Sequence, residues 1–190
     1  MSPSLSTEIS DERLAFAAGA GDRSAFSELV DRYTGRVVAA IDRRLGDHHA
    51  ALDVAQEVWI KVFRALPRFR EGPTFRSWLF SIALNATRDE GRRRQRRPHY
   101  DSEPLRPVAD PKDMTQERSI DEALQRVPEP FRSTLQLVDV EKFSYQEAAT
   151  ALGCNVGTVR SRLSRGRHAF REQWETDESG TVATNSGPTR

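Results

Sequence analysis

Apolar residues recur at three- and four-residue steps along most of the chain, which is the period of amphipathic helices. Residues 14–45 follow this period, but Gly19 and Gly21 interrupt it near its start. A short helix, a turn and a long helix are therefore predicted there. A second helix is predicted over 53–66 with a wide apolar stripe, and Pro67 ends it.

Residues 46–49 are predicted to connect these two helices, with His48 and His49 as an exposed pair. Asp53 and Glu57 stand one turn apart on the second helix, as a metal-binding nuclease pair does. No third ligand accompanies them, so an acidic surface for a partner is the preferred interpretation. Neither a metal site nor a cofactor is predicted.

A third helix is predicted from Phe75, with Phe80 off its apolar stripe and Phe69 in the loop that precedes it. Exposed aromatics beside basic residues suit stacking on unpaired bases, and peripheral core packing explains both rings equally well. The helix runs on into residues 92–97, which hold five arginines. Such a run is a phosphate-contact stripe or a disordered basic tail, and its position directly after an amphipathic helix favours phosphate contact.

From Pro98 to about Gln116 the chain holds four prolines and no apolar period, which is typical of a linker. Helical periodicity resumes from Arg118, and after Trp174 the chain turns to Thr, Ser, Gly and acids. The predicted fold is all-α, with two small helical domains joined by a flexible linker. The predicted order is a flexible N-terminus 1–13, a helical domain 14–97, a linker 98–117, a second helical domain 118–174 and a disordered tail 175–190.

The second domain contains a helix-turn-helix pattern. Ser144 and Glu147 form a capping-box pair that starts one helix, and Gly153 ends it. Asn155 is suited to capping a second helix. Two short helices joined by a tight glycine-containing turn make a helix-turn-helix.

The polar face of that second helix is basic. It carries no acid before Glu172. A helix fits the major groove, where Arg pairs with guanine edges and Thr or Ser reaches bases or phosphates. A solvated basic face is the alternative, but such faces usually include acids, so DNA binding is favoured. The candidate residues are Thr158, Arg160, Ser161, Arg162, Arg165 and Arg167.

Charge and cysteine content narrow the class of protein. The net charge is only +1, but residues 14–97 hold 16 basic and 10 acidic side chains, a local net of +6. Positive charge is therefore placed locally, as at a nucleic-acid site. The single Cys154 excludes an internal disulfide, which is consistent with a reducing cytoplasm. No secretory signal or membrane-spanning run is present, so a cytoplasmic protein is expected.

Three stretches in this order resemble the extracytoplasmic-function (ECF) type of bacterial RNA polymerase sigma factor, within the sigma-70 family. They are residues 53–66, 69–85 and 157–167, and the resemblance extends over roughly 14–172. It implies a transcription initiation factor rather than an enzyme. Its implied partners are the core polymerase (the clamp helices of the largest subunit and the flap of the second-largest), promoter DNA and an anti-sigma factor.

The resemblance also implies roles for individual residues. The helix 53–66 would bind the clamp helices through Asp53, Gln56 and Glu57. The first domain would capture the −10 element as an unpaired strand with one flipped base, through Lys61, Ala65, Phe69, Phe80, Asn85, Arg88, Arg92 and Arg93. The second domain would recognise the −35 element through Thr158, Arg160, Ser161, Arg162 and Arg165.

One loop departs from the family pattern. Residues 71–74 read Glu-Gly-Pro-Thr, which moves the glycine by one position and adds a proline, so the resemblance does not identify the flipped base. Two other functions compete with a sigma factor. An autonomous helix-turn-helix regulator would leave 53–97 without a role, and a recombinase or nuclease would need Asp53, Glu57, Asp89 and Glu90 to converge on a metal ion.

Overall fold

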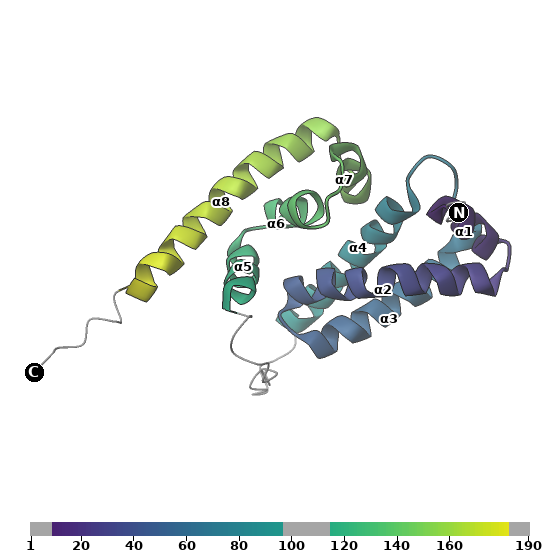
Figure 1. The fold of residues 1–190 in the computed structure, drawn as a ribbon, viewed down its shortest axis with the longest axis horizontal. Helices are drawn as coiled ribbons and strands as arrows, with labels where there is room; N and C mark the ends of the chain where they lie inside the picture. The colour runs from purple at the N-terminus through teal and green to yellow at the C-terminus, as the bar shows by residue number, and fades with distance from the viewer. Residues whose placement is uncertain (1–8, 97–114, 183–190) are drawn as a thin grey trace, which may run out of the picture. The chain divides into compact units, whose positions relative to one another are not determined.

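The structure is a computed structural model that describes residues 9–96 and 115–182. Every regular element within those two ranges is helical, which confirms the all-α prediction (Figure 1). The chain divides into two compact units, residues 1–97 and 98–190. The predicted linker lies almost entirely outside the described residues.

The first unit consists of four α-helices and one short 3₁₀ helix. They are α1 (Asp11–Gly19), α2 (Arg23–Leu45), α3 (His48–Ala65), η1 (Leu66–Arg68) and α4 (Phe75–Arg96). Both histidines predicted to lie in a connector instead form the first turn of α3. This helix begins early because the Asp47 carboxylate accepts a hydrogen bond from the Ala50 amide at 3.0 Å, which caps it.

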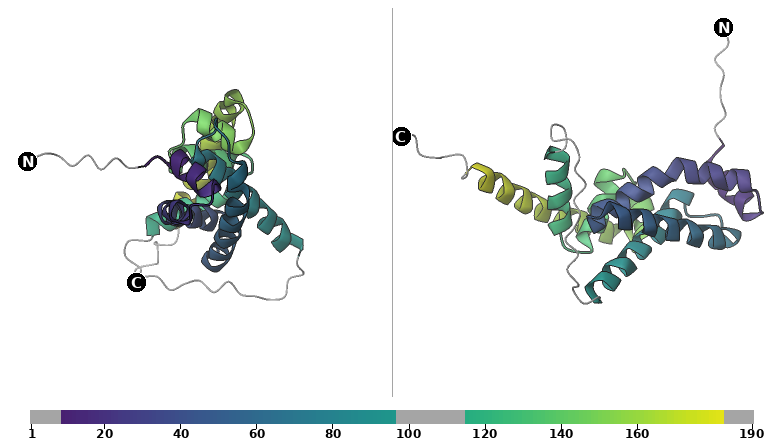
Figure 2. Two further views of the ribbon diagram at one scale, coloured as in Figure 1. Left: turned by 90° about the vertical axis from the view of Figure 1, so that its right-hand side faces the viewer. Right: turned by 90° about the horizontal axis from the view of Figure 1, so that it is seen from below.

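α2 and α3 lie side by side, and α4 packs against both (Figures 1 and 2). Their contacts form the core of this unit, and its largest fully buried side chains are Phe75, Phe80, Leu29, Ile41, Leu79, Val37, Val58 and Val62. Phe63 belongs to the wide apolar stripe predicted for 53–66, but its side chain is 54% exposed. The predicted apolar stripe of α3 is wider than the surface that α2 and α4 cover, so Phe63 lies at the rim against the Phe26 ring.

The second unit is built around one long helix. Its elements are α5 (Thr115–Arg126), α6 (Phe131–Leu135), the π-helix η2 (Gln136–Val140), α7 (Tyr145–Leu152) and α8 (Val156–Val182). α5 begins a few residues before the predicted domain start. α8 continues to Val182, whereas disorder was predicted from residue 175. No proline interrupts residues 156–182, so the backbone hydrogen-bond ladder is not broken there.

α5, α6 and α7 all pack against α8. Leu124, Val127, Leu135 and Leu163 form the buried cluster of this unit. α6 lies close to α8 at Gly166, where an added Cβ would be 3.0 Å from Leu135 Cγ. The absence of a side chain at Gly166 therefore allows α8 to pack tightly against α6.

Candidate nucleic-acid and polymerase interfaces

Both ends of α7 have the predicted capping geometry. The Ser144 amide donates to Glu147 Oε2 at 2.8 Å, and the Glu147 amide donates to Ser144 Oγ at 3.2 Å. Gly153 ends α7 in the left-handed conformation, with φ +62°. These contacts fix the direction in which α8 leaves the turn, and the predicted helix-turn-helix is confirmed.

The first residues of α8 are occupied by local hydrogen bonds. Asn155 Oδ1 accepts from the Thr158 amide at 2.7 Å and from the Thr158 hydroxyl at 3.0 Å. Ser161 Oγ donates to the Thr158 carbonyl at 3.0 Å. The hydroxyls of Thr158 and Ser161, which were predicted to contact DNA, are therefore hydrogen-bonded within the first turns of α8.

The arginines of α8 differ in their exposure. Val159 and Leu163 are buried, and their positions set the inner face of the helix. Arg160 and Arg165 are exposed, whereas Arg162 is half-buried. Two long guanidinium side chains are therefore presented outward at the start of the helix, as base recognition in a major groove requires.

Arg167 is held by an acid of η2. Its Nε and Nη2 atoms lie 3.0 and 2.7 Å from the two carboxylate oxygens of Asp139. This hydrogen-bonded pair raises the pKa of the Arg167 guanidinium above its ordinary value. The basic face predicted for α8 is thus partly neutralised at this position.

In the first unit, α4 divides its arginine run between two faces. Asn85, Arg88 and Arg92 stand three and four residues apart, so they share one face of the helix. Arg88 Nη1 donates to Asn85 Oδ1 at 3.3 Å. Asn85 and Arg92 are exposed, so this face presents an amide and two guanidinium groups together.

The next two arginines are tied to α3 and its cap. Arg93 Nη1 lies 3.5 Å from Glu57 Oε1, and Arg94 Nη2 lies 3.0 Å from Asp47 Oδ2. The hydrogen bond from Ala50 and the pairing with Arg94 lower the pKa of the Asp47 carboxyl. Arg93, which the resemblance implies for the −10 element, therefore lies away from the face of Asn85.

Phe69 and Phe80 are not exposed aromatics. Phe80 is only 1% exposed, and the Arg36 guanidinium lies 5.9 Å from its ring centroid. Phe69 is 4% exposed and packs among Phe16, Phe75 and Trp78. Both rings therefore pack in the core and are not available to stack on bases. The loop after η1 folds Phe69 inward. Two further residues implied for the −10 element lie on α3. Lys61 is exposed and Ala65 is half-buried.

The outer face of α3 combines acids with large apolar side chains. Asp53, Gln56 and Glu57 are all exposed, as predicted. They alternate with Leu52 and Ile60, which are 46% and 48% exposed, and Phe63 completes the apolar part of this face. The sequence held a signal for this surface, because Leu52 and Ile60 fall opposite the buried stripe.

A groove of about 540 Å³ lies between α5, η2 and the later turns of α8. Apolar side chains line most of it, with the Arg167–Asp139 pair at its edge. Its apolar walls are Ile120, Leu124, Leu135, Val140, Phe170 and Trp174. This groove was not predicted from the sequence, since it depends on how three separate segments meet.

Within 9–96 and 115–182, no three His, Cys, Asp or Glu side chains cluster closely enough to hold a metal ion. None of the helices in those ranges is both long enough and apolar enough to cross a membrane.

Family comparisons match both units. The Sigma-70 region 2 family matches residues 29–97, and the Sigma-70, region 4 family matches residues 117–169. The chain is 35% identical to the RNA polymerase sigma-H factor of Pseudomonas aeruginosa, an alignment that covers 86% of this chain and 93% of that protein. It is 30% identical to the ECF RNA polymerase sigma-E factor of Escherichia coli K12, over 87% of this chain and 95% of that protein.

Solved structures agree with the sequence matches. CnrH, in complex with the cytosolic domain of CnrY, matches with a TM-score of 0.70 and 28% identity, over 88% of this chain and 98% of CnrH. RpoE of Bartonella quintana, in complex with the anti-sigma factor NepR, matches with a TM-score of 0.66 and 25% identity, over 80% and 98% of the two chains. The chain belongs to the ECF sigma factors of the sigma-70 family. Members of this class direct RNA polymerase to promoters and initiate transcription.

Proposed function

We propose that the outer face of α3 docks this sigma factor on the clamp helices of the largest polymerase subunit. Leu52, Ile60 and Phe63 supply the apolar centre, and Asp53, Gln56 and Glu57 supply the polar rim. A cluster of large apolar side chains, each about half exposed and bordered by polar residues, is typical of a protein-binding surface. This exposed face on the unit that matches region 2 is the observation on which the proposal rests.

The same unit captures the −10 element on the neighbouring helix α4. Asn85 offers an amide for a base edge, and Arg88 and Arg92 lie on its face to hold phosphates. Lys61 adds an exposed cation from α3. Because Phe69 and Phe80 are buried, they belong to the core of this unit and do not stack on bases.

The second unit recognises the −35 element as intact duplex. Arg160 and Arg165 are the base-reading side chains, because they are exposed at the start of α8. Ser161 and Thr158 act through the helix start that they stabilise, and the half-buried Arg162 lies at the edge of this surface.

The apolar groove of the second unit receives the flap of the second-largest polymerase subunit. Apolar side chains line most of this groove, and Ile120 and Val140 are its most exposed walls, as a protein-binding surface requires. An anti-sigma factor that covers this groove or the face of α3 would block polymerase binding. The sigma factor itself acts in the cytoplasm, where polymerase and promoter DNA are found.

Run-off transcription over a library of promoters with randomised −35 and −10 elements tests the whole assignment. Core polymerase supplemented with the chain is expected to initiate selectively, whereas core polymerase alone should not. The assignment fails if the chain adds no promoter selectivity.

The two docking surfaces are tested by binding to core polymerase. We expect Ile60→Asp to weaken binding more than about tenfold, which is typical of a central interface residue. Ile9→Asp is the matched control, because Ile9 is 49% exposed and lies outside α3. For the groove, Ile120→Asp should weaken binding of an isolated flap fragment, with Gln146→Asp on α7 as the control. Equal behaviour of variant and control would remove that surface from the interface.

A further inference from the structure

The loop between η1 and α4 encloses a recess of about 260 Å³ against α1. This volume is below the range of about 300–1,000 Å³ usual for drug-sized ligands, so the recess suits a single flat group. Its wall includes two α1 residues, and α1 precedes residues 29–97, which match the region 2 family. The principal lining residues are Glu12, Phe16, Phe69, Arg70, Pro73 and Thr74.

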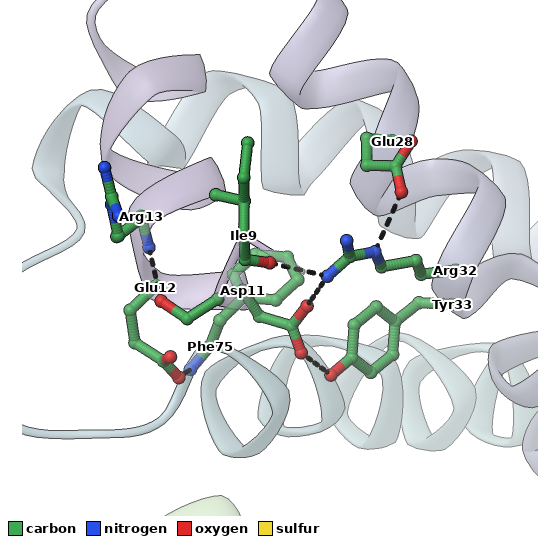
Figure 3. A network of polar contacts seen from close by, with 9 residues as sticks. Ile9, Asp11, Glu12, Arg13, Glu28, Arg32, Tyr33 and Phe75 are labelled. Atoms are coloured by element: carbon green, nitrogen blue, oxygen red, sulfur yellow. Dashed lines mark hydrogen bonds and ion pairs between the residues drawn. The ribbon is translucent and has the colours of Figure 1, made fainter. Parts of the chain in front are cut away.

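α1 is held firmly where it meets α2. The Asp11 carboxylate accepts a hydrogen bond from Arg32 Nη1 at 2.8 Å and another from the Tyr33 hydroxyl (Figure 3). Arg32 Nη1 also donates to the Ile9 carbonyl at 2.9 Å. Tyr33 is buried, and the Arg32 and Asp11 side chains are 26% and 27% exposed, so this polar contact is partly shielded from water. The wall that α1 contributes is thus fixed relative to the rest of the unit.

Glu12 joins that wall to the end of the loop. Its Oε1 atom accepts a hydrogen bond at 3.1 Å from the amide of Phe75, the first residue of α4 (Figure 3). This contact satisfies an amide that has no partner within its own helix. Among the described residues no hydrogen bond reaches Glu12 Oε2, so one carboxylate oxygen remains able to accept from a ligand in the recess.

Phe16 is the aromatic side chain that the recess exposes. Its side chain is 40% exposed, whereas Phe69, whose ring centroid is 5.4 Å away, is 4% exposed. Arg70 donates to the Pro67 and Phe69 carbonyls at 3.1 and 3.0 Å, which ties it to the loop backbone. The recess therefore combines a ring face with a carboxylate oxygen.

We propose that α1 completes the site for the flipped base of the −10 element, with Phe16 stacking on the base and Glu12 accepting a hydrogen bond from its exocyclic amino group. Carboxylates accept from base amino groups such as cytosine N4, and aromatic side chains stack on any base. Thymine, which has no amino group, is the base that the site disfavours. This inference rests on the proposed capture of the −10 strand, to which it adds two specificity-determining residues.

Run-off transcription with core polymerase, over promoters that carry each of the four bases at every −10 position, tests the proposal. Phe16→Ala should reduce initiation by about 5- to 150-fold, the loss that corresponds to one stacked base. Glu12→Gln should relieve the thymine penalty at one −10 position only. The amide carbonyl of Gln still accepts from Phe75, so the loop stays in place while the charge is lost.

Matched controls separate this role from a structural one. Ile9→Ala removes an exposed apolar side chain next to α1, and Asp31→Asn removes an exposed carboxylate of the same unit. Neither should change −10 preference. If Phe16→Ala lowers the thermal midpoint of unfolding, the Phe16→Leu variant is tested in its place. Leu keeps apolar contact with Phe69 but lacks the ring.

Two results would overturn the inference. One is an unchanged −10 preference in the Glu12 variant together with unchanged initiation by the folded Phe16 variant. The other is a uniform loss of activity that thermal unfolding explains. In either case selective initiation by the unmodified chain would leave the proposed function standing, whereas loss of that selectivity in the unmodified chain would remove both.

Discussion

The guanidinium of Arg93 lies 3.5 Å from the carboxylate of Glu57, across the contact between α4 and α3. The pair joins a run of arginines at the proposed promoter surface to an acid on the proposed polymerase surface. Its two side chains are 56% and 47% exposed, so the pair contributes at most about 1 kcal/mol. We expect polymerase docking on Glu57 to weaken this pair and to leave Arg93 beside Glu90, whose Oε2 atom lies 3.7 Å from Arg93 Nη1.

The Glu57→Gln variant tests this link. Loss of the carboxylate should weaken binding to core polymerase and strengthen binding of the free chain to single-stranded DNA by no more than about fivefold. Fluorescence anisotropy at several salt concentrations measures the second effect, with Glu28→Gln as the control. Unchanged values in both assays would mean that Glu57 serves neither partner.

Arg160→Ala and Arg165→Ala should each weaken use of the −35 element by about 1–3 kcal/mol and relax its sequence preference. The reason is that both guanidinium groups are exposed at the start of α8. Transcription over −35 variants measures both effects. Arg171→Ala, farther along the same helix, should leave the preference as it is. If all three variants behave alike, these arginines contact only phosphates.

Asn85→Ala should impair −10 selection and strand opening while binding to core polymerase is retained. Asn85 is exposed on the α4 face that also carries Arg88 and Arg92, apart from the α3 surface proposed for docking. Permanganate footprinting of the opened strand and a polymerase binding assay measure the two properties. Gln95→Ala, an exposed amide on the same helix, is the control. An unchanged −10 preference would exclude Asn85 from base recognition.

Protonation of Asp47 should make the first unit less stable at low pH. Its folded-state pKa is lowered below the ordinary value of 3.8, so its contribution is complete above about pH 4 and is lost as the pH falls through the folded-state value. At neutral pH Asp47→Ala should cost about 1 kcal/mol, because it removes the cap of α3 and the partner of Arg94.

Urea unfolding at neutral and acidic pH measures this cost. Asp47→Asn should be milder than Asp47→Ala, since an amide oxygen still caps the helix. The difference between the unmodified chain and the Asn variant should vanish at low pH. A difference that persists there would mean that charge is not the cause.

The sequence by itself determined the features that depend on neighbouring residues. Ser144 and Glu147 lie three positions apart, and Gly153 and Asn155 flank the turn, so local hydrogen bonding alone identifies the helix-turn-helix. Helical periodicity likewise predicted most helices and the all-α class. It erred at the ends, where a single cap such as Asp47 moves a boundary.

Only the tertiary structure decided which polar and aromatic side chains reach the surface. Phe69 and Phe80 are buried because other elements of the unit cover them, and Arg93 pairs with Glu57 because α3 packs beside α4. Periodicity locates a residue around one helix axis, but it does not locate the next helix. The recess at Glu12 and Phe16 arises for the same reason, since hydrogen bonds between residues distant in sequence bring α1 to the loop.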